Sequence, residues 1–347
     1  MSYLLILGGL VLLFAGGESV VRGSVGVARK LGVSELVIGL TLVGFGTSAP
    51  ELVTSLQAVK QGAVGMSVGN VAGSNIANIL LVMGIAALIR PIVTEPRALT
   101  RDFSVMIAAT LIFAALAYFD IFTRLAGAVL VTLLVTYITV SFILDKTNSD
   151  TAGLHAEEGE QIETHDPLPV ALALSFLGIA GVVIGARLLV SGGIDIAQQF
   201  GVSDTLIGLT IVAIGTSLPE VATVGMSAIR GKSDVALGTV LGSNIFNIFG
   251  IIGVTALVRP FSLFSGAEIS HSSGFDYSSV LGRGGDALSM SSSLSWTDIS
   301  TIILSVFFII LFALTGKRLA RWEGGLLLAG YGLYMGFLFN IVPTPFA

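Results

Sequence analysis

The chain has 347 residues, of which 54% are hydrophobic and only 11% charged, and its mean hydropathy is +0.94. A soluble domain carries about 25% charged residues, so this composition excludes an ordinary water-soluble protein and favours one whose solvent is lipid. The absence of Cys excludes disulfides and thiolate metal sites, and a net charge of −5 gives no sign of a nucleic-acid surface.

Apolar runs long enough to cross a bilayer follow one another along the whole chain. A helix needs roughly 20 mostly apolar residues to span the hydrocarbon core. In chain order, we expect spans near 3–21, 34–59, 64–88, 103–120, 125–144, 168–190, 203–229, 234–258, 299–316 and 323–341. The prediction is an all-α membrane protein with ten transmembrane helices, five in each half.

Two polar segments interrupt these spans. Residues 145–167 hold seven carboxylates and separate a first five-helix repeat at 1–144 from a second at 168–347. An acidic run is usually solvated, so we expect a cytoplasmic linker, with a regulatory cation site as the alternative. Residues 261–298 are rich in Ser and Gly and predict an external loop within the second repeat.

The distribution of Lys and Arg predicts the orientation of the chain, because cytoplasmic loops carry an excess of these residues. If the N-terminus lies outside, twelve Lys and Arg residues fall on the cytoplasmic side and four on the outer side. We therefore expect a multi-pass protein of the cell membrane with both termini outside.

The chain contains an internal repeat. Residues 32–91 align with 201–260 at a constant offset of 169 without a gap, and 28 of the 60 positions are identical. The matching helices are the second and third spans of one half and the seventh and eighth of the other. Because five spans separate the partners, the two copies cross the membrane in opposite directions. Inverted repeats are typical of transporters, whose substrate sites lie at the repeat interface near the bilayer midplane.

Two acidic residues lie where an apolar span should carry none. Glu51 interrupts the second predicted span and Glu220 the seventh, at equivalent positions of the two copies. An ionisable group at the bilayer centre is costly and marks a functional site by default. A protonated or salt-bridged structural pair is the alternative, but no basic residue of these helices lies at comparable depth.

Other oxygen-bearing side chains share the helix faces of the two acids. Thr47 and Ser48 precede Glu51 by four and three residues, so these three lie on one face. Ser74 and Asn78 form another pair four residues apart. The second copy repeats both groups with Thr216, Ser217, Glu220, Ser243 and Asn247. Carboxylate, hydroxyl and amide oxygens are the ligands that Ca2+ and Na+ prefer.

A proline directly precedes each acid, at Pro50 and Pro219. A proline inside a helix lacks an N–H and displaces a carbonyl of the preceding turn, so we expect a kink and a backbone oxygen that lines a cavity. Two carboxylates balance one Ca2+ or two Na+ ions. Because an empty site would leave both charges in a low dielectric, the sequence predicts obligatory exchange of these cations.

The motifs GTSAPE (46–51), GTSLPE (215–220), GSNIAN (73–78) and GSNIFN (242–247) resemble the Ca2+/cation antiporter superfamily, and within it the prokaryotic Na+/Ca2+ exchangers. The resemblance covers both repeats and implies one Ca2+ site flanked by Na+ sites at their interface. It adds backbone ligands near Gly44 and Ala213 to the side chains above. The metal-binding residues expected are thus Gly44, Thr47, Ser48, Glu51, Ser74, Asn78, Ala213, Thr216, Ser217, Glu220, Ser243 and Asn247.

The resemblance has further consequences. It implies that the first and sixth spans, here about 3–26 and 170–195, slide across the remaining bundle to switch access. Glu18 and Arg187 hold equivalent positions in these spans, where packing or interface anchoring is favoured over a role in the ion path.

Asn247 stands where some relatives, K+-dependent exchangers among them, carry Asp, so the sequence favours K+-independent exchange. The 261–298 stretch is longer than the family's connection.

The function expected is secondary active, electrogenic antiport of Na+ and Ca2+ by alternating access, without enzymatic activity or a cofactor. The partners expected are the transported ions and membrane lipid, and a monomeric state is compatible with these features. An H+/Ca2+ exchanger of the same superfamily and a passive cation channel are the alternatives. An intramembrane hydrolase is disfavoured because no Ser/His, Asp/Asp or His/Glu metal group lies at depth.

Overall fold

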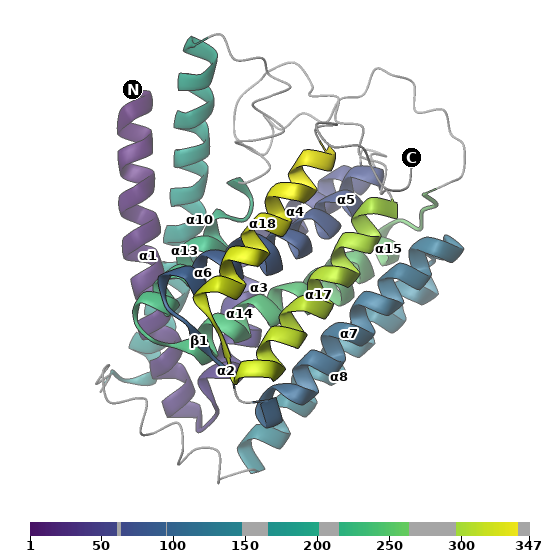
Figure 1. Ribbon diagram of the computed structural model, residues 1–347, viewed down its shortest axis with the longest axis horizontal. Helices are drawn as coiled ribbons and strands as arrows, with labels where there is room; N and C mark the ends of the chain where they lie inside the picture. The colour runs from purple at the N-terminus through teal and green to yellow at the C-terminus, as the bar shows by residue number, and fades with distance from the viewer. Residues whose placement is uncertain (61–63, 95, 148–165, 201–214, 264–295, 339–347) are drawn as a thin grey trace.

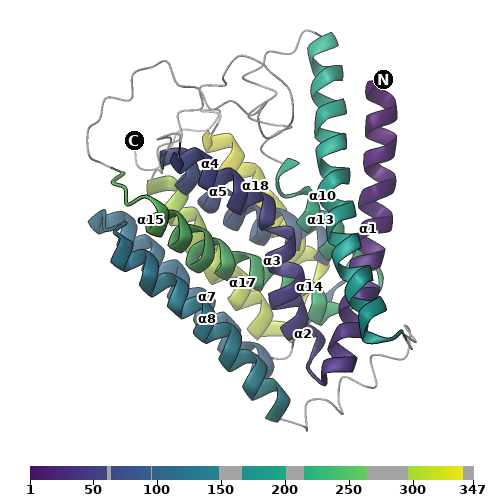
Figure 2. The ribbon, with the colours of Figure 1, turned by 180° about the vertical axis from the view of Figure 1, so that it is seen from behind.

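The computed structural model describes residues 1–60, 64–94, 96–147, 166–200, 215–263 and 296–338, nearly all of them helical (Figures 1 and 2). The first half contains α1 (Ser2–Leu31), α2 (Glu35–Ile38), the π-helical turn η1 (Gly39–Val43), α3 (Gly44–Thr47), α4 (Ala49–Lys60), α5 (Val64–Ile76), the π-helical turn η2 (Ala77–Val82), α6 (Met83–Ile89), β1 (Ile92–Val93), α7 (Pro96–Phe119) and α8 (Arg124–Thr147). The second half contains α10 (Leu168–Gln199), α13 (Leu218–Ile229), α14 (Ser233–Ile245), the π-helical turn η5 (Phe246–Ile252), α15 (Gly253–Val258), α17 (Trp296–Gly316), β2 (Arg318–Leu319) and α18 (Arg321–Leu338).

The expectation of a multi-pass helical membrane protein is confirmed. Among the described residues, seven helices are long and apolar enough to cross a membrane, and the bent pair Glu35–Thr47 and Ala49–Lys60 makes an eighth. Of the seventh expected span the structure describes only α13, since 201–214 lie outside the described residues, and α18 occupies the tenth. The count of ten spans therefore stays a prediction, and most of the linker at 145–167 and the loop at 261–298 also lies outside the described residues.

The centre of the molecule is formed by α5–η2–α6 and α14–η5–α15, the third and eighth expected spans. Nearly every residue of α14 is buried. Its apolar side chains, such as Leu237 and Leu241, belong to the largest hydrophobic core of the described residues. By contrast, α1 and α10 expose many large apolar side chains, such as Phe14 and Leu177, as expected of helices that face lipid. The two GSN motifs thus lie on the most enclosed of the long described helices.

Helices α1 and α10 pair along most of their length, on the opposite side of the molecule from α7 and α8 (Figures 1 and 2). Glycine makes this close approach possible. A Cβ at Gly23 would lie 2.5 Å from the backbone nitrogen of Ser175, and one at Gly178 would lie 2.7 Å from that of Val20. Small residues at a helix interface let backbones approach and pack tightly in a membrane. The two expected sliding spans therefore contact each other directly.

A double ion pair ties α1 to the end of α13. Arg230 Nη2 lies 2.6 Å from Glu18 Oε1, and Arg230 Nε lies 2.7 Å from Glu18 Oε2. Bidentate contacts of this kind fix geometry as well as charge. Glu18 thus anchors α1 to the second half, which is the role that the sequence favoured for this residue.

Short antiparallel strand contacts join the two halves. In β1 and β2, Ile92 pairs with Leu319 and Val93 with Arg318. A second bridge joins Phe122 to Phe261, whose rings stack with centroids 4.6 Å apart. Ile92 and Phe261 are equivalent positions of the internal repeat, so each half uses the residue after its Arg-Pro dipeptide to pair with the other half.

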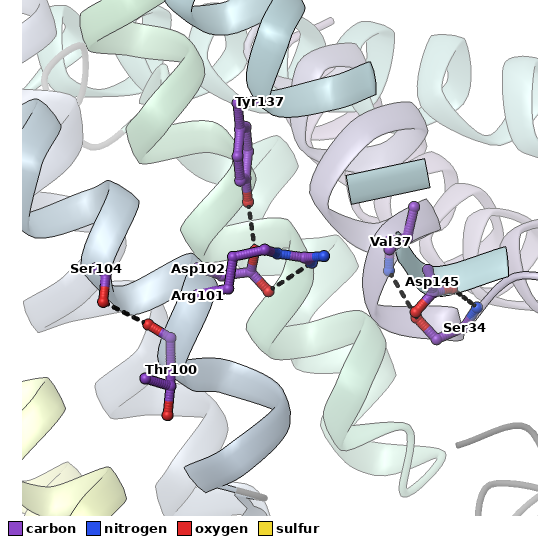
Figure 3. Close-up of polar contacts among 8 residues, drawn as sticks. All are labelled: Ser34, Val37, Thr100, Arg101, Asp102, Ser104, Tyr137 and Asp145. Atoms are coloured by element: carbon purple, nitrogen blue, oxygen red, sulfur yellow. Dashed lines mark hydrogen bonds and ion pairs between the residues drawn. The ribbon is translucent and has the colours of Figure 1, made fainter. Parts of the chain in front are cut away.

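Buried Tyr–Asp hydrogen bonds link the last two described helices of each half. Tyr137 Oη donates to Asp102 Oδ1 at 3.0 Å, joining α8 to α7 (Figure 3), and Tyr334 Oη donates to Asp298 Oδ1 at the same distance, joining α18 to α17. Arg101 adds an ion pair of 2.8 Å to Asp102. The sequence pattern did not reveal these contacts, although they recur in both halves.

Candidate functional site

The helix of the first GTS-x-PE motif breaks at its Ser, and the Ser of the second motif has the same backbone conformation. A bend of 45° separates Thr47, the end of α3, from Ala49, the start of α4, so that it falls at Ser48. Ser48 has φ −85° and ψ 6°, and its equivalent Ser217 has φ −89° and ψ 1°. This sparsely populated backbone region is common in functional sites. The kink expected from Pro50 is therefore present, and the second copy has the same local geometry.

Each acid lies in the first turn of the helix that follows its break. Glu51 is the third residue of α4 and Glu220 the third of α13, and both side chains are buried, with 1% of their surface exposed. Free backbone N–H groups give a helix N-terminus partial positive charge, which stabilises a carboxylate there. The Pro at each position costs no hydrogen bond, because N–H groups of the first turn have no helical partner. The motif thus places a buried carboxylate at the start of a helix, twice.

The two copies meet across the repeat interface. Ser48 Oγ donates to Glu220 Oε1 at 3.2 Å, although the residues are 172 positions apart. Ser48 precedes Glu51 by three residues, so this contact brings the segments that carry the two acids together. Two neighbouring negative charges repel, and the repulsion is removed when a cation lies between them.

A backbone oxygen belongs to the same region. The carbonyl of Gly44 accepts hydrogen bonds from Ser243 Oγ at 3.0 Å and from Thr47 Oγ1 at 3.3 Å. A Cβ at Gly44 would lie 3.0 Å from backbone atoms of α14, so glycine allows this approach. Gly44, Thr47 and Ser243 are therefore brought together, as expected, whereas Ala213 lies outside the described residues.

The terminal Asn of each GSN motif lies at the start of a π-helical turn. Asn78 belongs to η2 and Asn247 to η5, and both are almost fully buried. Such turns are rare and occur frequently at functional sites, because the extra residue re-aims neighbouring side chains. Asn78 Nδ2 donates to Asn244 Oδ1 at 3.3 Å and Asn247 Nδ2 to Asn75 Oδ1 at 2.9 Å. The two amides thus bond across the interface in the same way.

Four of the expected ligand oxygens are buried without a hydrogen-bond partner among the described residues. They are Glu51 Oε2, Glu220 Oε2, Asn78 Oδ1 and Asn247 Oδ1. Three further buried oxygens, on Gln57, Ser67 and Ser141, also lack a partner, but they are not expected ligands. An unsatisfied buried acceptor is costly, and a bound ion is one of the explanations for such a group. All four oxygens are hard ligands of the type that Ca2+ and Na+ bind. Within the described ranges no three or more His, Cys, Asp or Glu side chains cluster, so the charge of this donor set comes from two acids alone.

The remaining predicted residues lie on the same segments. Ser74 on α5 and Ser217 before α13 are buried, and Thr216 is half-buried beside Ser217. The sequence pattern missed Asn75 and Asn244, and also Asn70, whose Nδ2 donates to the backbone oxygen of Glu51 at 3.3 Å. The GSN motif itself contains Asn75 and Asn244, and this repetition was the signal that could have found them.

Comparisons with known proteins give relatives that match most of the chain. Sodium/calcium exchanger MaX1 of Methanosarcina acetivorans is 35% identical to this chain over 98% of the chain and 99% of the relative. Inner membrane protein YrbG of Escherichia coli is 35% identical over 74% of the chain and 79% of the relative. A structure of the sodium-calcium exchanger NCX_Mj superposes with a TM-score of 0.76 at 31% identity, covering 97% of this chain and 98% of the other.

The family match covers both halves of the chain and omits the acidic segment between them. Residues 1–143 and 170–340 match the family described as sodium/calcium exchanger protein. Members of this family are transporters rather than enzymes. The chain therefore belongs to the sodium/calcium exchanger protein family, and the resemblance found in its four motifs is confirmed.

Proposed function

We propose that this chain is a secondary active antiporter that exchanges Na+ for Ca2+ across the membrane by alternating access. The observation that carries the proposal is the set of unpartnered buried oxygens on Glu51, Glu220, Asn78 and Asn247. A relative of full length, MaX1, is a sodium/calcium exchanger by name, and NCX_Mj structures were obtained with Na+, Ca2+ and Sr2+. These relatives support the same two cargo ions for this chain.

The proposed site is the full donor set at the interface of the two motifs. Its ligands are Gly44, Thr47, Ser48, Glu51, Ser74, Asn78, Ala213, Thr216, Ser217, Glu220, Ser243 and Asn247. Ca2+ takes six to eight oxygen ligands, so this set is large enough for one Ca2+ or for several Na+ ions. The two acids supply the charge, and the hydroxyl, amide and backbone oxygens complete the coordination. No cofactor is needed for this reaction.

Exchange follows from the electrostatics of the site. With either one Ca2+ or two Na+ bound, the positive charge of the ions balances the two carboxylates. The loaded site is then neutral, so the change of access does not expose a net charge to a low dielectric. Without an ion, the ionised forms of Glu51 and Glu220 would be buried with no countercharge, which is unfavourable in a low dielectric. The protein therefore changes its access when it is loaded, and each ion leaves only in return for another.

We further propose that exchange is electrogenic and independent of K+. The uncharged donors of the set are numerous enough to bind a third Na+. The Na+-loaded site would then carry one net positive charge where the Ca2+-loaded site is neutral, and this difference is what makes the exchange electrogenic. With Asn at both position 78 and position 247, the site has no third acid to balance a co-transported K+. Uptake of Ca2+ in exchange for internal Na+ should then rise when the vesicle interior is made positive, and should be unchanged when choline replaces K+.

The central experiment is uptake of radiolabelled Ca2+ by proteoliposomes that contain the purified chain. Uptake that depends on an outward Na+ gradient supports the proposal. Uptake driven by a pH gradient without Na+ would instead identify an H+/Ca2+ exchanger. Uptake that needs no counter-ion on the opposite side would identify a passive channel. Empty liposomes and liposomes with the Glu51→Gln variant provide the background.

A further inference from the structure

The central Asn of each GSN motif holds the terminal Asn of the other copy. Asn247 Nδ2 donates to Asn75 Oδ1 at 2.9 Å, and Asn78 Nδ2 donates to Asn244 Oδ1 at 3.3 Å. Positions 75 and 244 are equivalent in the internal repeat, as are 78 and 247, so the two hydrogen bonds are repeat-related. At most 2% of the surface of any of these side chains is exposed, so water does not compete for the contacts.

Orientation matters for an amide in a way that it does not for a carboxylate. The Asn side chain ends in one oxygen and one NH2 group of similar size, and only the oxygen binds a cation. If the amide of Asn247 were turned by 180°, its NH2 group would replace its oxygen in the donor set. A cation site that uses Asn therefore needs a second group that determines which end of the amide faces the ion.

Asn75 has the contacts required for this role. Its Nδ2 donates to the backbone oxygen of Asn244 at 3.3 Å, and a backbone carbonyl can only accept. This contact places the oxygen of the Asn75 amide on the side of Asn247, which must then donate its NH2 group. The oxygen of Asn247 is left pointing away from Asn75, and it has no hydrogen-bond partner among the described residues.

The repeat-related contact is set less firmly. The amide nitrogen of Asn244 is buried and makes no hydrogen bond to any described residue, so the backbone contact that orients Asn75 has no equivalent at Asn244. The longer bond from Asn78 to Asn244 agrees with this difference. Both copies use one Asn side chain to orient another, and the orientation is determined by more hydrogen bonds at Asn75 than at Asn244.

We propose that Asn75 is a positioning residue that directs the side-chain oxygen of Asn247 toward the transported cation, and that Asn244 does the same for Asn78. The inference rests on the proposed exchange of Na+ and Ca2+ at this site. Asn75 does not itself touch the ion. It determines the ligand that Asn247 presents, and it thereby sets the affinity for Ca2+ more than the rate at which the loaded protein switches access.

The test compares Asn75→Leu in two backgrounds. Leu has the branched shape of Asn, with two larger methyl groups in place of the amide atoms, and it has no acceptor, so the amide of Asn247 loses its fixed orientation. We expect the Ca2+ concentration for half-maximal uptake to rise by about tenfold, which is the factor expected for about 1.4 kcal/mol, with a smaller change in maximal rate. In an Asn247→Asp background the terminal residue presents oxygen in either orientation. There, Asn75→Leu should change the half-saturating Ca2+ concentration by less than about twofold.

Equilibrium binding of radiolabelled Ca2+ to the purified full-length variants is measured beside transport. This makes failure of the positioning role distinguishable from failure of the proposed function. Loss of Na+-driven uptake in the unmodified chain with Ca2+ binding retained would overturn the exchange function, while the binding data still test the positioning role. An Asn75→Leu effect of equal size in both backgrounds, or no effect on Ca2+ affinity, would overturn the positioning role.

Two further variants keep the test decisive if Asn75→Leu does not fold. Asn75→Ala removes the acceptor without adding bulk and should give the same dependence on background. Asn244→Leu, tested with and without Asn78→Asp, is the matched pair for the other copy, and its effect on Ca2+ affinity should be smaller. An Asn244→Leu effect larger than that of Asn75→Leu would contradict the order inferred from the backbone contact of Asn75.

Discussion

At the scale of single residues, the site is defined by two acids that no basic residue neutralises among the described contacts. Glu51 and Glu220 each lie at the start of a helix, where the backbone offers partial positive charge but not a full countercharge. Ser48 adds one hydrogen bond to Glu220. In the proposed site, the transported ions balance the remaining negative charge, and the number of acids then limits the charge of the cargo.

Replacing either acid by its amide therefore tests the site directly. Glu51→Gln or Glu220→Gln keeps the side-chain volume and removes one charge, so bound Ca2+ would leave the buried site with a net positive charge. We expect Na+-driven Ca2+ uptake to fall by at least about tenfold, equivalent to about 1.4 kcal/mol or more. Uptake into proteoliposomes is the measurement, and unchanged elution in size-exclusion chromatography shows that the fold is intact.

The matched control is Glu323→Gln, which changes a buried carboxylate at the start of α18. Glu323 Oε2 accepts a hydrogen bond from the backbone of Ala320, and the oxygen of Gln can replace that acceptor. This variant should transport at the rate of the unmodified chain. Normal uptake by Glu51→Gln, or equal losses in the site variant and the control, would contradict the assignment of the acids.

The sequence was sufficient to locate the acids but not the asparagines that support the site. Glu51 and Glu220 are conspicuous because each is polar within an apolar run, and the repeat aligns them. Asn75 precedes Asn78 by three residues and so lies near the same helix face, but its partner Asn247 is 172 positions away. A contact at that separation depends on how the two copies pack, which neither helical spacing nor the polarity of a single segment indicates.

At the scale of helices, the sequence predicted where a helix bends, but it did not predict which helices contact each other. The break beside Pro50 was expected, since proline cannot continue the preceding turn. The Tyr–Asp contacts of α7 with α8 and of α17 with α18 were not expected. Tyr137 and Asp102 are 35 positions apart, Tyr334 and Asp298 are 36 apart, and both pairs lie outside the aligned repeat of 60 residues.

The Tyr–Asp contacts lead to a prediction about stability. Tyr137→Phe and Tyr334→Phe each keep the ring and remove one buried hydrogen bond to a carboxylate, a contact that contributes about 1.5–3 kcal/mol. We expect each variant to unfold at a lower temperature, measured by fluorescence-detected size-exclusion chromatography after heating, while Na+-driven Ca2+ uptake at low temperature persists. Tyr331→Phe, on the same helix α18, is the control. A melting temperature unchanged in both variants would show that these contacts do not hold the helices together.

At the scale of the whole molecule, we propose that both termini lie outside the cell membrane, on the basis of the Lys and Arg distribution. The natural absence of Cys makes the test direct, because any introduced Cys is the only thiol. A Cys at the exposed Tyr3 should react with a membrane-impermeant maleimide added to intact cells, whereas a Cys at the exposed Lys30 should react only after permeabilisation. The reverse pattern would invert the orientation and would leave the ion site unchanged.

The strand contacts also determine how the two halves depend on each other. β1 of the first half pairs with β2 of the second, and Phe122 of the first pairs with Phe261 of the second. Each half on its own would therefore expose unpaired strand edges and half of a donor set. A chain divided within 148–165 and produced as two co-expressed fragments should still assemble and bind Ca2+, whereas either fragment alone should aggregate. The covalent connection between the halves is then dispensable, and their mutual pairing is what makes one transporter from two similar parts.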